Sequence, residues 1–395
     1  MSASLTRLLA RLLGRMPIGW LQLTHNRTRM AAALAGVAFA NVLVFVQLGI
    51  LGALNATIVT TYDPLRADVI LSPSDANTLT DGSRVARAWL YQALSVPGVA
   101  AAAPLHLAKL DWTRPDGSTA SMQVYGLPPE AERFASATIA HGFSHLRLQD
   151  AALIDVRTRG VTREEFGRIS PQTPLRFEAN GITLSAVGTL RMGGGFSADG
   201  NLVVSDQTFL RLFGQRVAGA PSRILIETAP GASREAVAEA IRLRLGDAPV
   251  RVATLEEAIA ADKAYQSTQR PTGVIFGFGV LIGVLVGIVI VYQVLATDVA
   301  DHLREYATFK AMGYRHRFFL GVVFEEALVL AILGFLPGIA LAALIYAAMS
   351  QATGLPVSMD AARAAMVFVG TIAACALSGA IATRRLAGAD PADLF

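Results

Sequence analysis

Four stretches of the chain contain no charged side chain over a length that can cross a bilayer. They run over residues 30–62, 271–297, 327–359 and 364–383. About 20 apolar residues at a rise of about 1.5 Å each span the hydrocarbon core, so each stretch predicts a transmembrane helix. Their spacing is uneven, because residues 63–270 separate the first span from the other three. The sequence therefore predicts a membrane protein with a large domain inserted between its first and second spans.

Basic residues next to the spans indicate the orientation. Before the first span the chain has five arginines and no acid, at Arg7, Arg11, Arg15, Arg27 and Arg29. The 298–317 loop carries Arg304, Lys310, Arg315 and Arg317, and Arg384 and Arg385 follow the last span. Because cytoplasmic segments are enriched in Lys and Arg, we expect all three on the cytoplasmic side and the inserted domain outside.

These features divide the chain into consecutive segments. The predicted order is an interfacial helix over 1–29, a first span with its stalk over 30–62, the extracytoplasmic domain over 63–270, a second span over 271–297, a cytoplasmic coupling loop over 298–317, a third span over 318–349, a short outer loop over 350–363, a fourth span over 364–383 and a cytoplasmic tail over 384–395. The first segment places six apolar residues on one helical face, opposite its arginines, as in a helix that lies in the membrane interface. A disordered basic tail is the alternative.

Composition agrees with a membrane protein that has a substantial soluble part. Hydrophobic residues make up 53% of the chain and charged residues only 16%. The net charge of +4 is small and its basic residues flank the spans, so nucleic-acid binding explains it poorly. The one cysteine, Cys375, lies in the fourth span, so the extracytoplasmic domain has no disulfides. We expect Cys375 to pack as a small apolar residue within that span.

The inserted domain has mixed α and β patterns. Strands are predicted over 67–71, 98–112, 222–228 and 249–253, and helices over 83–94 and 233–245. Ser233 is a predicted N-cap, and Asn180-Gly181 predicts a hairpin turn. Since β-α-β patterns stand at both ends and turns are frequent between them, we infer an outer subdomain, about 115–220, inserted into a membrane-proximal one.

No catalytic or metal-binding motif is found. The chain has no phosphate loop, no H-E-x-x-H, no G-x-S-x-G and no C-x-x-C. His141 and His145 share helical spacing, but no acid nearby completes a ligand pattern. We therefore expect neither an enzyme nor a cofactor or metal site in this chain.

The cytoplasmic loop is the main candidate for function. Residues 304–314 predict about three turns of amphipathic helix, with Gly313 available as the stop. A short exposed helix between two spans can dock into a groove on a soluble partner and transmit force. A solvated loop that serves topology alone is the alternative.

Two features of the spans suggest helix contacts. Glycines in the second span repeat at four-residue spacing and permit close helix approach, either at a dimer axis or within one chain. They are Gly273, Gly277, Gly279, Gly283 and Gly287. Glu325 and Glu326 precede the third uncharged run, and we expect them at the cytoplasmic interface near Arg315 and Arg317, with a proton relay as the alternative.

Several of these segments resemble a known family. The stretch 304–313 (REYATFKAMG), the stretch 324–327 (FEEA) and Gly334 are similar to the C-terminal permease signature of the MacB and FtsX superfamily. The DevC branch is more similar still, through WLQL at 20–23, AGVAFA at 35–40, ADGNL at 198–202 and DVADHL at 298–303. The similar segments are spread over nearly the full chain.

The resemblance implies an ABC transporter permease of the bacterial cytoplasmic (inner) membrane. It implies a homodimer with a separate ATPase that binds ATP and magnesium, since this chain has no ATPase domain of its own. The ATPase contact would be formed by six residues of the loop: Arg304, Glu305, Phe309, Lys310, Met312 and Gly313. ATP-driven closure would move this coupling helix, and the spans would carry the motion to the periplasmic domain.

Partners and cargo are implied by the same resemblance. MacB-like members engage a periplasmic membrane-fusion adaptor and a TolC-type outer-membrane channel, and DevC-like members export glycolipids or other amphipathic compounds. Two alternatives stay open: an FtsX-like mechanotransmitter that regulates a periplasmic hydrolase, and a lipoprotein-release permease. The predicted fold class is an α-helical membrane protein with four transmembrane helices and a large α+β extracytoplasmic domain between the first two.

Overall fold

The chain folds into two compact units. The computed structural model describes residues 18–114, 117–161, 166, 168–301, 308, 312–314 and 316–387. The described residues of 1–52, 274–348 and 357–395 form a helical unit, and residues 53–273 and 349–356 form an α+β unit. The interfacial helix predicted from residues 1–17 lies outside the described residues.

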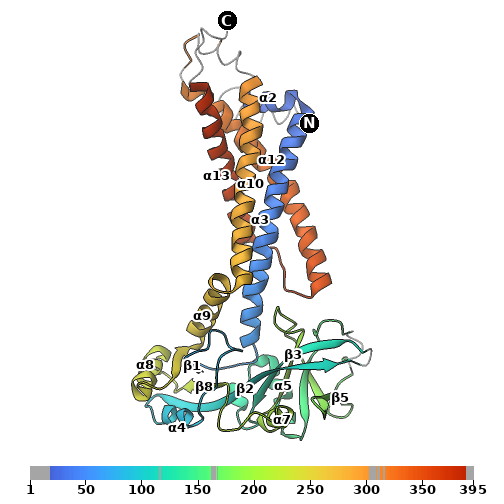
Figure 1. The fold of residues 1–395 in the computed structure, drawn as a ribbon, viewed down its shortest axis with the longest axis vertical. Helices are drawn as coiled ribbons and strands as arrows, with labels where there is room; N and C mark the ends of the chain where they lie inside the picture. The colour runs from blue at the N-terminus through green and yellow to red at the C-terminus, as the bar shows by residue number, and fades with distance from the viewer. Residues whose placement is uncertain are drawn as a thin grey trace. The chain divides into compact units, whose positions relative to one another are not determined.

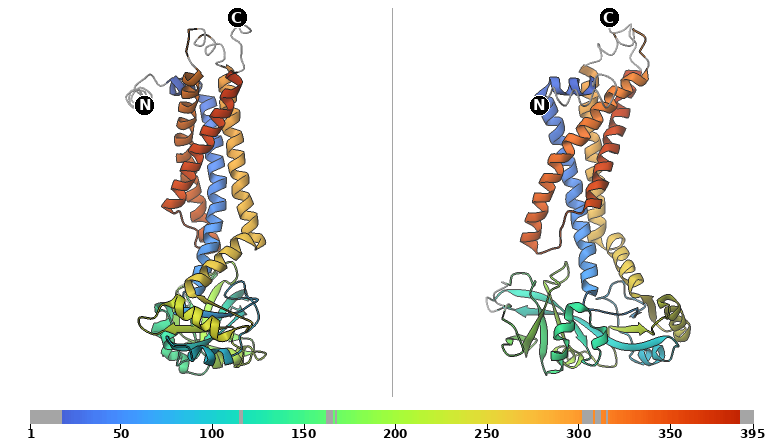
Figure 2. Two further views of the ribbon diagram at one scale, coloured as in Figure 1. Left: turned by 90° about the vertical axis from the view of Figure 1, so that its left-hand side faces the viewer. Right: turned by 180° about the vertical axis from the view of Figure 1, so that it is seen from behind.

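The helical unit contains four long apolar helices. Its elements are α2 (Ile18–His25), α3 (Arg27–Tyr62), α10 (Pro271–Asp301), α12 (His316–Thr353) and α13 (Ala361–Ala387). Among the described residues, α3, α10, α12 and α13 are long and apolar enough to cross a membrane. These four helices run side by side (Figures 1 and 2). The predicted fold class is confirmed: four such helices, with a large α+β domain between the first and the second.

Small and branched side chains fill the contacts among these helices. The buried cluster joins all five helices and includes Leu23, Val37, Leu295, Ala327 and Cys375. Cys375 is a free thiol with 1% of its surface exposed. It therefore occupies the place of a small apolar residue, as predicted.

The α+β unit is built on one nine-stranded sheet with the strand order β5-β6-β4-β7-β3-β2-β8-β1-β9. The strands are β1 (Val69–Pro73), β2 (Val99–Thr113), β3 (Thr119–Leu127), β4 (Ala151–Asp155), β5 (Leu175–Ala179), β6 (Ile182–Leu190), β7 (Gly200–Ser205), β8 (Arg223–Thr228) and β9 (Val250–Thr254). The helices are α4 (Ala88–Leu94), α5 (Ala137–Phe143), α7 (Asp206–Leu212), α8 (Arg234–Leu245) and α9 (Leu255–Thr268), with short 3₁₀ turns η1 (Glu132–Phe134) and η2 (Ser144–Arg147).

The two predicted β-α-β patterns interleave in the sheet. The units β1–α4–β2 and β8–α8–β9 each place one strand between the two strands of the other, in the order β2-β8-β1-β9. Strand β1 is antiparallel to both β8 and β9, and β2 is antiparallel to β8. This is the arrangement of a split β-α-β fold. Strands β3 to β7, which come between the two units in the sequence, all lie on the other side of β2.

The inserted strands share one core with the split β-α-β part and have a second core of their own. Strand β2 joins the two parts, because its first half pairs with β8 and its second half with β3. On one face a single cluster includes Ile70, Tyr125 and Leu225. The opposite face has two separate clusters, one under α7 and one under α4 and α8. Residues 53–273 are thus one compact unit, and a separate outer subdomain over about 115–220 stays a prediction.

Local signals set the turns and helix starts. Asn180 and Gly181 have φ angles of +49° and +74° and link β5 to β6, with Ala179 opposite Ile182. Both positive values suit a two-residue hairpin, so the predicted hairpin is confirmed.

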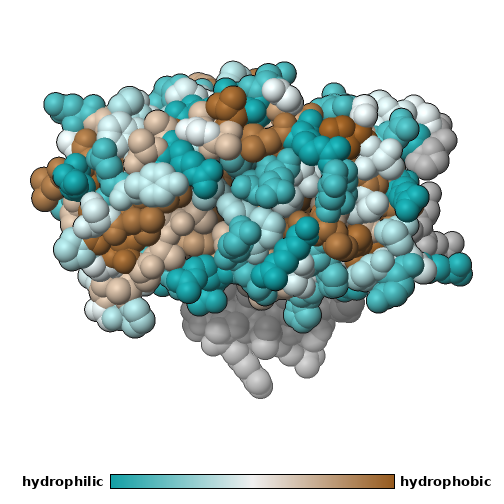
Figure 3. Space-filling model, turned by 90° about the horizontal axis from the view of Figure 1, so that it is seen from below, coloured by the Kyte–Doolittle hydropathy of each residue, from teal (hydrophilic) through white to brown (hydrophobic). Residues whose placement is uncertain are grey.

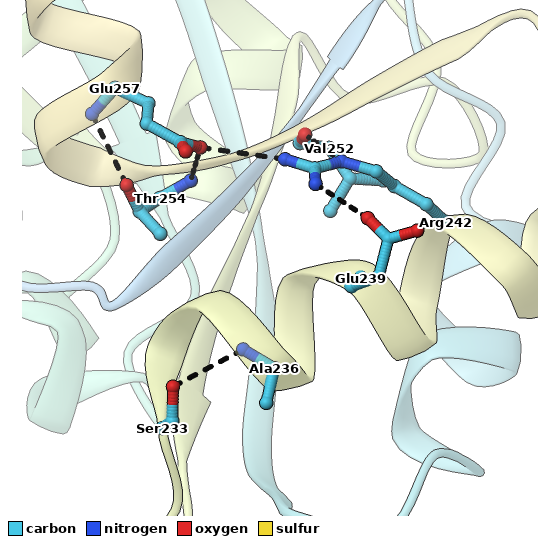
Figure 4. Close-up of polar contacts among 7 residues, drawn as sticks. All are labelled: Ser233, Ala236, Glu239, Arg242, Val252, Thr254 and Glu257. Atoms are coloured by element: carbon cyan, nitrogen blue, oxygen red, sulfur yellow. Dashed lines mark hydrogen bonds and ion pairs between the residues drawn. The ribbon is translucent and has the colours of Figure 1, made fainter.

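Polar side chains cap the N-termini of α8 and α9. The Ser233 hydroxyl accepts the Ala236 N–H at 3.3 Å and caps α8, as predicted. Thr254 and Glu257 form a capping box at the start of α9, with reciprocal bonds of 3.2 and 3.0 Å (Figure 4). Arg242 of α8 reaches the Glu257 carboxylate at 3.4 Å, which links the two helices.

The helix predicted over 83–94 begins only at Ala88. Residues before it bond to other segments instead: the Ser83 N–H donates to Asp75, the Val85 N–H to Pro221 O and the Arg87 N–H to Gly219 O. Backbone groups committed to distant partners cannot form helical bonds, so the prediction is wrong for residues 83–87.

Candidate coupling site

In the described part of the 298–317 loop, a helical turn ends at the exposed residue Met312. The Met312 N–H donates to Thr308 O at 3.0 Å, and 61% of the Met312 residue surface is exposed. Gly313 follows with a φ of +90°, a conformation that favours glycine at a helix end. The other four predicted coupling residues lie outside the described residues: Arg304, Glu305, Phe309 and Lys310.

Helix α2 packs against the first turns of α12, just after the loop. A Cβ atom at Gly19 would lie 2.8 Å from Val322 O and 2.9 Å from the Glu326 side chain, so only glycine permits this approach. The Trp20 N–H, in the first turn of α2, donates to Glu325 Oε1 at 3.3 Å.

Glu325 and Glu326 are buried, with 6% and 0% of their surfaces exposed. The Glu325 carboxylate accepts the Trp20 N–H of α2, and the Glu326 side chain lies against Gly19 of the same helix. Arg315 and the side chain of Arg317, their predicted neighbours, lie outside the described residues. The structure thus assigns Glu325 a structural role at α2, which the sequence alone did not reveal.

An ion pair joins the end of α10, just before the loop, to α3. Arg29 Nη1 of α3 lies 2.5 Å from Asp301 Oδ2, the last residue of α10, and Arg29 Nη2 donates to Val294 O at 3.4 Å. A cavity of about 190 Å³ beside this pair is lined by residues of α2, α3 and α10. Opposite charges at the ends of two spans were the available sequence signal for this contact.

Three of the five predicted packing glycines of α10 face α3 of the same chain. Added Cβ atoms would lie 2.5 Å from the Gln47 side chain at Gly279, 3.0 Å from Val44 at Gly283 and 3.1 Å from Ala40 at Gly287. Gly277 has no atom of a described residue within 4 Å of its Cβ position, whereas Gly273 is packed against Gln266 and Ser267 at the end of α9. The close approach therefore serves packing within the chain at three positions, and Gly277 alone is open.

A polar pair lies inside the helical unit. The Thr371 hydroxyl of α13 donates to Asn41 Oδ1 of α3 at 2.6 Å, and both residues are at least nine-tenths buried. They line a largely apolar cavity of about 320 Å³ formed by α3, α10 and α13. The sequence analysis missed this pair, although Asn41 is a polar residue within the first uncharged stretch.

No group of three or more His, Cys, Asp or Glu side chains that could hold a metal ion occurs among the described residues. His141 lies on α5 and His145 on η2. The described part of the chain thus offers no metal centre.

The surface of the α+β unit carries scattered apolar side chains. Exposed ones include Tyr91, Leu148, Val217 and Leu243. Figure 3 shows hydrophobic and hydrophilic residues interspersed over one face of this unit. The pattern does not single out one docking surface for an adaptor on that face.

Two family models match the chain. The MacB-like periplasmic core domain matches residues 30–244, and the FtsX-like permease C-terminal model matches residues 277–391. A search of curated proteins finds no significant match.

Three solved structures align with part of the chain. The extracellular domain of the noncanonic ABC-type transporter YknZ from Gram-positive bacteria is 15% identical, with a TM-score of 0.33, and the alignment covers 48% of this chain and 98% of that one. The periplasmic region of MacB from Actinobacillus actinomycetemcomitans is 11% identical, with a TM-score of 0.33 and coverage of 55% and 100%. A domain of a putative permease protein from Porphyromonas gingivalis is 16% identical, with a TM-score of 0.30 and coverage of 49% and 90%.

The first family model covers more than half of the chain, and the second covers the region of the last three membrane-crossing helices and the loop between them. Together with an α+β unit between the first and second apolar helices, these matches define the protein class. The chain belongs to the MacB/FtsX-like permease superfamily and is a permease subunit of an ABC transporter in the inner membrane.

Proposed function

We propose that this permease couples ATP hydrolysis in a separate ABC ATPase subunit to conformational change in its α+β unit, and thereby drives export of an amphipathic substrate. The loop between α10 and α12 docks the ATPase through Arg304, Glu305, Phe309, Lys310, Met312 and Gly313. ATP and magnesium bind to the ATPase. The permease itself is not an enzyme, which agrees with its family.

This proposal is supported mainly by the contacts that both ends of the loop between α10 and α12 make with neighbouring helices. Asp301, before the loop, pairs with Arg29 of α3, and Glu325, after it, accepts the N–H of Trp20 in α2. A force on the loop therefore reaches α3 and α2 as well as α10 and α12. Helix α3 continues as one helix from Arg27 to Tyr62, so it is a stiff element for transmitting such motion.

The finer assignments rest on the sequence resemblance to the DevC branch. They are a homodimeric permease with four spans, a glycolipid-like or other amphipathic cargo, a periplasmic membrane-fusion adaptor and a TolC-type outer-membrane channel. The family implies an ABC ATPase as a partner.

The docking surface is tested with the double variant Glu305→Lys and Met312→Asp. The charge reversal and the loss of an exposed apolar side chain should abolish copurification of a coexpressed ABC ATPase subunit from detergent. The matched control is Leu243→Asp, because Leu243 is 77% exposed on α8 and outside the loop. Recruitment that survives the double variant, with normal membrane insertion, would show that the loop is not the docking surface.

Transmission is tested separately with Arg29→Glu. Two acids then face each other where the ion pair stood, so ATPase recruitment should persist while ATP turnover by the assembled complex changes. The charge swap Arg29→Glu with Asp301→Arg should restore turnover toward the wild-type rate. If the single variant and the swap behave alike, the ion pair takes no part in coupling.

The copurifying periplasmic protein distinguishes export from regulation. A membrane-fusion adaptor retained by the complex supports the exporter, whereas a cell-wall hydrolase in its place overturns the export assignment in favour of an FtsX-like regulator. A working complex with a single kind of permease chain counts against lipoprotein release.

A further inference from the structure

A polar cavity of about 230 Å³ lies inside the α+β unit. Segments that are far apart in the sequence form its wall: residues 54–61 of α3, the 78–80 loop, strands β2, β3 and β7, the 193–198 loop and residues 262–272. Sites for drug-sized ligands occupy roughly 300 Å³ or more, so this cavity suits a smaller molecule or a headgroup.

Asp262 of α9 is the most buried charged group of the wall, with 4% of its surface exposed. Its Oδ2 accepts the Leu79 N–H at 3.1 Å and the Tyr62 hydroxyl at 3.4 Å. Its Oδ1 is buried and receives no hydrogen bond from any residue that the structure describes. A buried acceptor without a donor is costly, so a ligand that donates a hydrogen bond here recovers that cost.

Two more acceptors of the wall are buried without a donor. They are Gln123 Oε1 on β3 and Thr78 Oγ1 in the 78–80 loop. The amide nitrogen of Gln123 already donates to Ala108 O at 3.1 Å, which leaves its oxygen available. The three residues together offer oxygen atoms to a group with several N–H donors, and a primary ammonium has three.

Two cations also line the cavity. Lys109 of β2 lies opposite Gln123 in the sheet, and Arg270 follows α9. Neither forms an ion pair with any residue that the structure describes. Two such cations disfavour a bare divalent metal ion and favour a ligand that brings its own negative charge.

We propose that this cavity binds a small zwitterion that carries a primary ammonium and a phosphate or carboxylate. The ammonium donates to Asp262, with Gln123 and Thr78 as further acceptors, and the anionic group pairs with Lys109 and Arg270. A phosphoethanolamine lipid headgroup and a free amino acid share this chemistry. Because the wall includes the end of α3 and the segment that leads into α10, the bound ligand links the ends of the first two apolar helices to the sheet.

Binding is measured by calorimetry on the purified, delipidated full chain in detergent at pH 7.5. Glycerophosphoethanolamine represents the headgroup and glycine the free amino acid, so the tighter of the two identifies the source. Glycerophosphocholine should bind at least tenfold more weakly than glycerophosphoethanolamine, because its quaternary nitrogen has no N–H to donate. Calcium chloride serves as the test for a simple cation site.

Variants of Asp262 and Lys109 test which residue binds the ammonium of the ligand and which binds its anionic group. Asp262→Asn should weaken binding of glycerophosphoethanolamine at least tenfold. Lys109→Gln should weaken binding of glycerophosphoethanolamine more than that of ethanolamine, which has the ammonium but no anionic group. Glu256→Gln is the matched control, since this acid lies on the same helix with 87% of its side chain exposed, and it should bind like the wild type. The proposal is overturned if neither zwitterion binds, if glycerophosphocholine or calcium binds as well as glycerophosphoethanolamine, or if Asp262→Asn has no effect. ATPase recruitment is a separate measurement, so failure here leaves the proposed function standing.

Discussion

Gly283 of α10 lies so close to Val44 of α3 that an added Cβ atom would be 3.0 Å from Val44 Cγ2 and 3.5 Å from the Val44 backbone nitrogen. The first of these contacts would be tighter than an ordinary van der Waals distance, and the second would be an ordinary one. The first two long helices therefore meet nearly backbone to backbone, as small residues allow in membranes.

Gly283→Leu should destabilise the protein because the larger side chain has no space against α3. Overpacking of this kind costs about 1–3 kcal/mol, so we expect a lower thermal unfolding midpoint in detergent. Gly277→Leu is the control on the same helix, since no atom lies within 4 Å of its Cβ position, and its midpoint should match the wild type. An equal loss in both variants would indicate that another chain covers Gly277.

The hydrogen bond between Thr371 and Asn41 should contribute measurably to the helical unit. Thr371→Val removes the donor of a 2.6 Å contact and leaves Asn41 Oδ1 buried without it. Asn41 Nδ2 has no hydrogen-bond partner among the described residues, so the variant leaves both polar atoms of the Asn41 side chain without one there.

A double-mutant cycle with Thr371→Val and Asn41→Val isolates this pair. Interhelical hydrogen bonds in membranes average about 0.6 kcal/mol and reach about 1.7 kcal/mol, so we expect a coupling energy in that range from denaturation in mixed micelles. The double variant should be more stable than the sum of the single losses predicts, because both polar groups are then removed. Additive losses would mean that the two side chains do not interact.

The uncharged runs predicted the spans because burying charge in a bilayer is costly, and that constraint leaves a direct trace in the sequence. The β-α-β patterns, the Ser233 cap and the Asn180-Gly181 turn were likewise local signals. Strand order is a different matter, because the interleaving of the two β-α-β units depends on pairing between strands more than 100 residues apart, such as β1 with β8. The false helix over 83–87 failed for the same reason, since its N–H groups bond to residues 219 and 221.

In the candidate site, too, local features were predicted from the sequence and long-range contacts were not. The loop stood out because its pattern is local and amphipathic. The contacts that fasten its ends were hidden, because Arg29 with Asp301 and Trp20 with Glu325 join residues from opposite ends of the chain. The polar cavity was hidden too, since Asp262 acquires its surroundings only when α3, α9 and the sheet come together.

His106 should make the α+β unit less stable in mild acid. Burial, and then Arg216, Arg87 and Arg84, lower the pKa of His106 to about 4, and only 2% of the residue is exposed. The unfolded chain takes up a proton near pH 6.5 while the folded chain does not, so stability is lost as pH falls from about 6.5 to 4, by on the order of 3 kcal/mol.

The variant His106→Leu should remove this part of the pH dependence. Thermal unfolding midpoints of the full chain at pH 7.5, 6 and 5 would fall less steeply in the variant than in the wild type. His141→Gln, at an exposed position on α5, is the control and should follow the wild type. Parallel curves for His106→Leu and the wild type would show that His106 is protonated as readily in the folded as in the unfolded chain.

Asp262 should make the folded protein less stable as the pH rises, which is the opposite of the effect of His106. Burial is the main cause that raises its pKa from 3.8 to about 6, and Asp81 adds to it, while the Leu79 N–H, the Tyr62 hydroxyl and Arg270 oppose it. Because the folded chain holds the proton more tightly, its stabilising contribution is complete below about pH 4 and is lost as pH rises to about 6. The loss is on the order of 3 kcal/mol.

Asp262→Asn keeps the shape of the side chain without its charge, so the ligand-free variant should be more stable than the wild type at pH 7.5 and equal to it near pH 4. Glu256→Gln, an exposed acid on the same helix, should show no such convergence. Both variants are compared with the wild type by the unfolding midpoints of the delipidated full chain across this pH range. A variant that is less stable than the wild type at pH 7.5 would mean that the ionised carboxylate already has a favourable partner in the folded protein. A constant difference at every pH would mean that ionisation of Asp262 is not the cause.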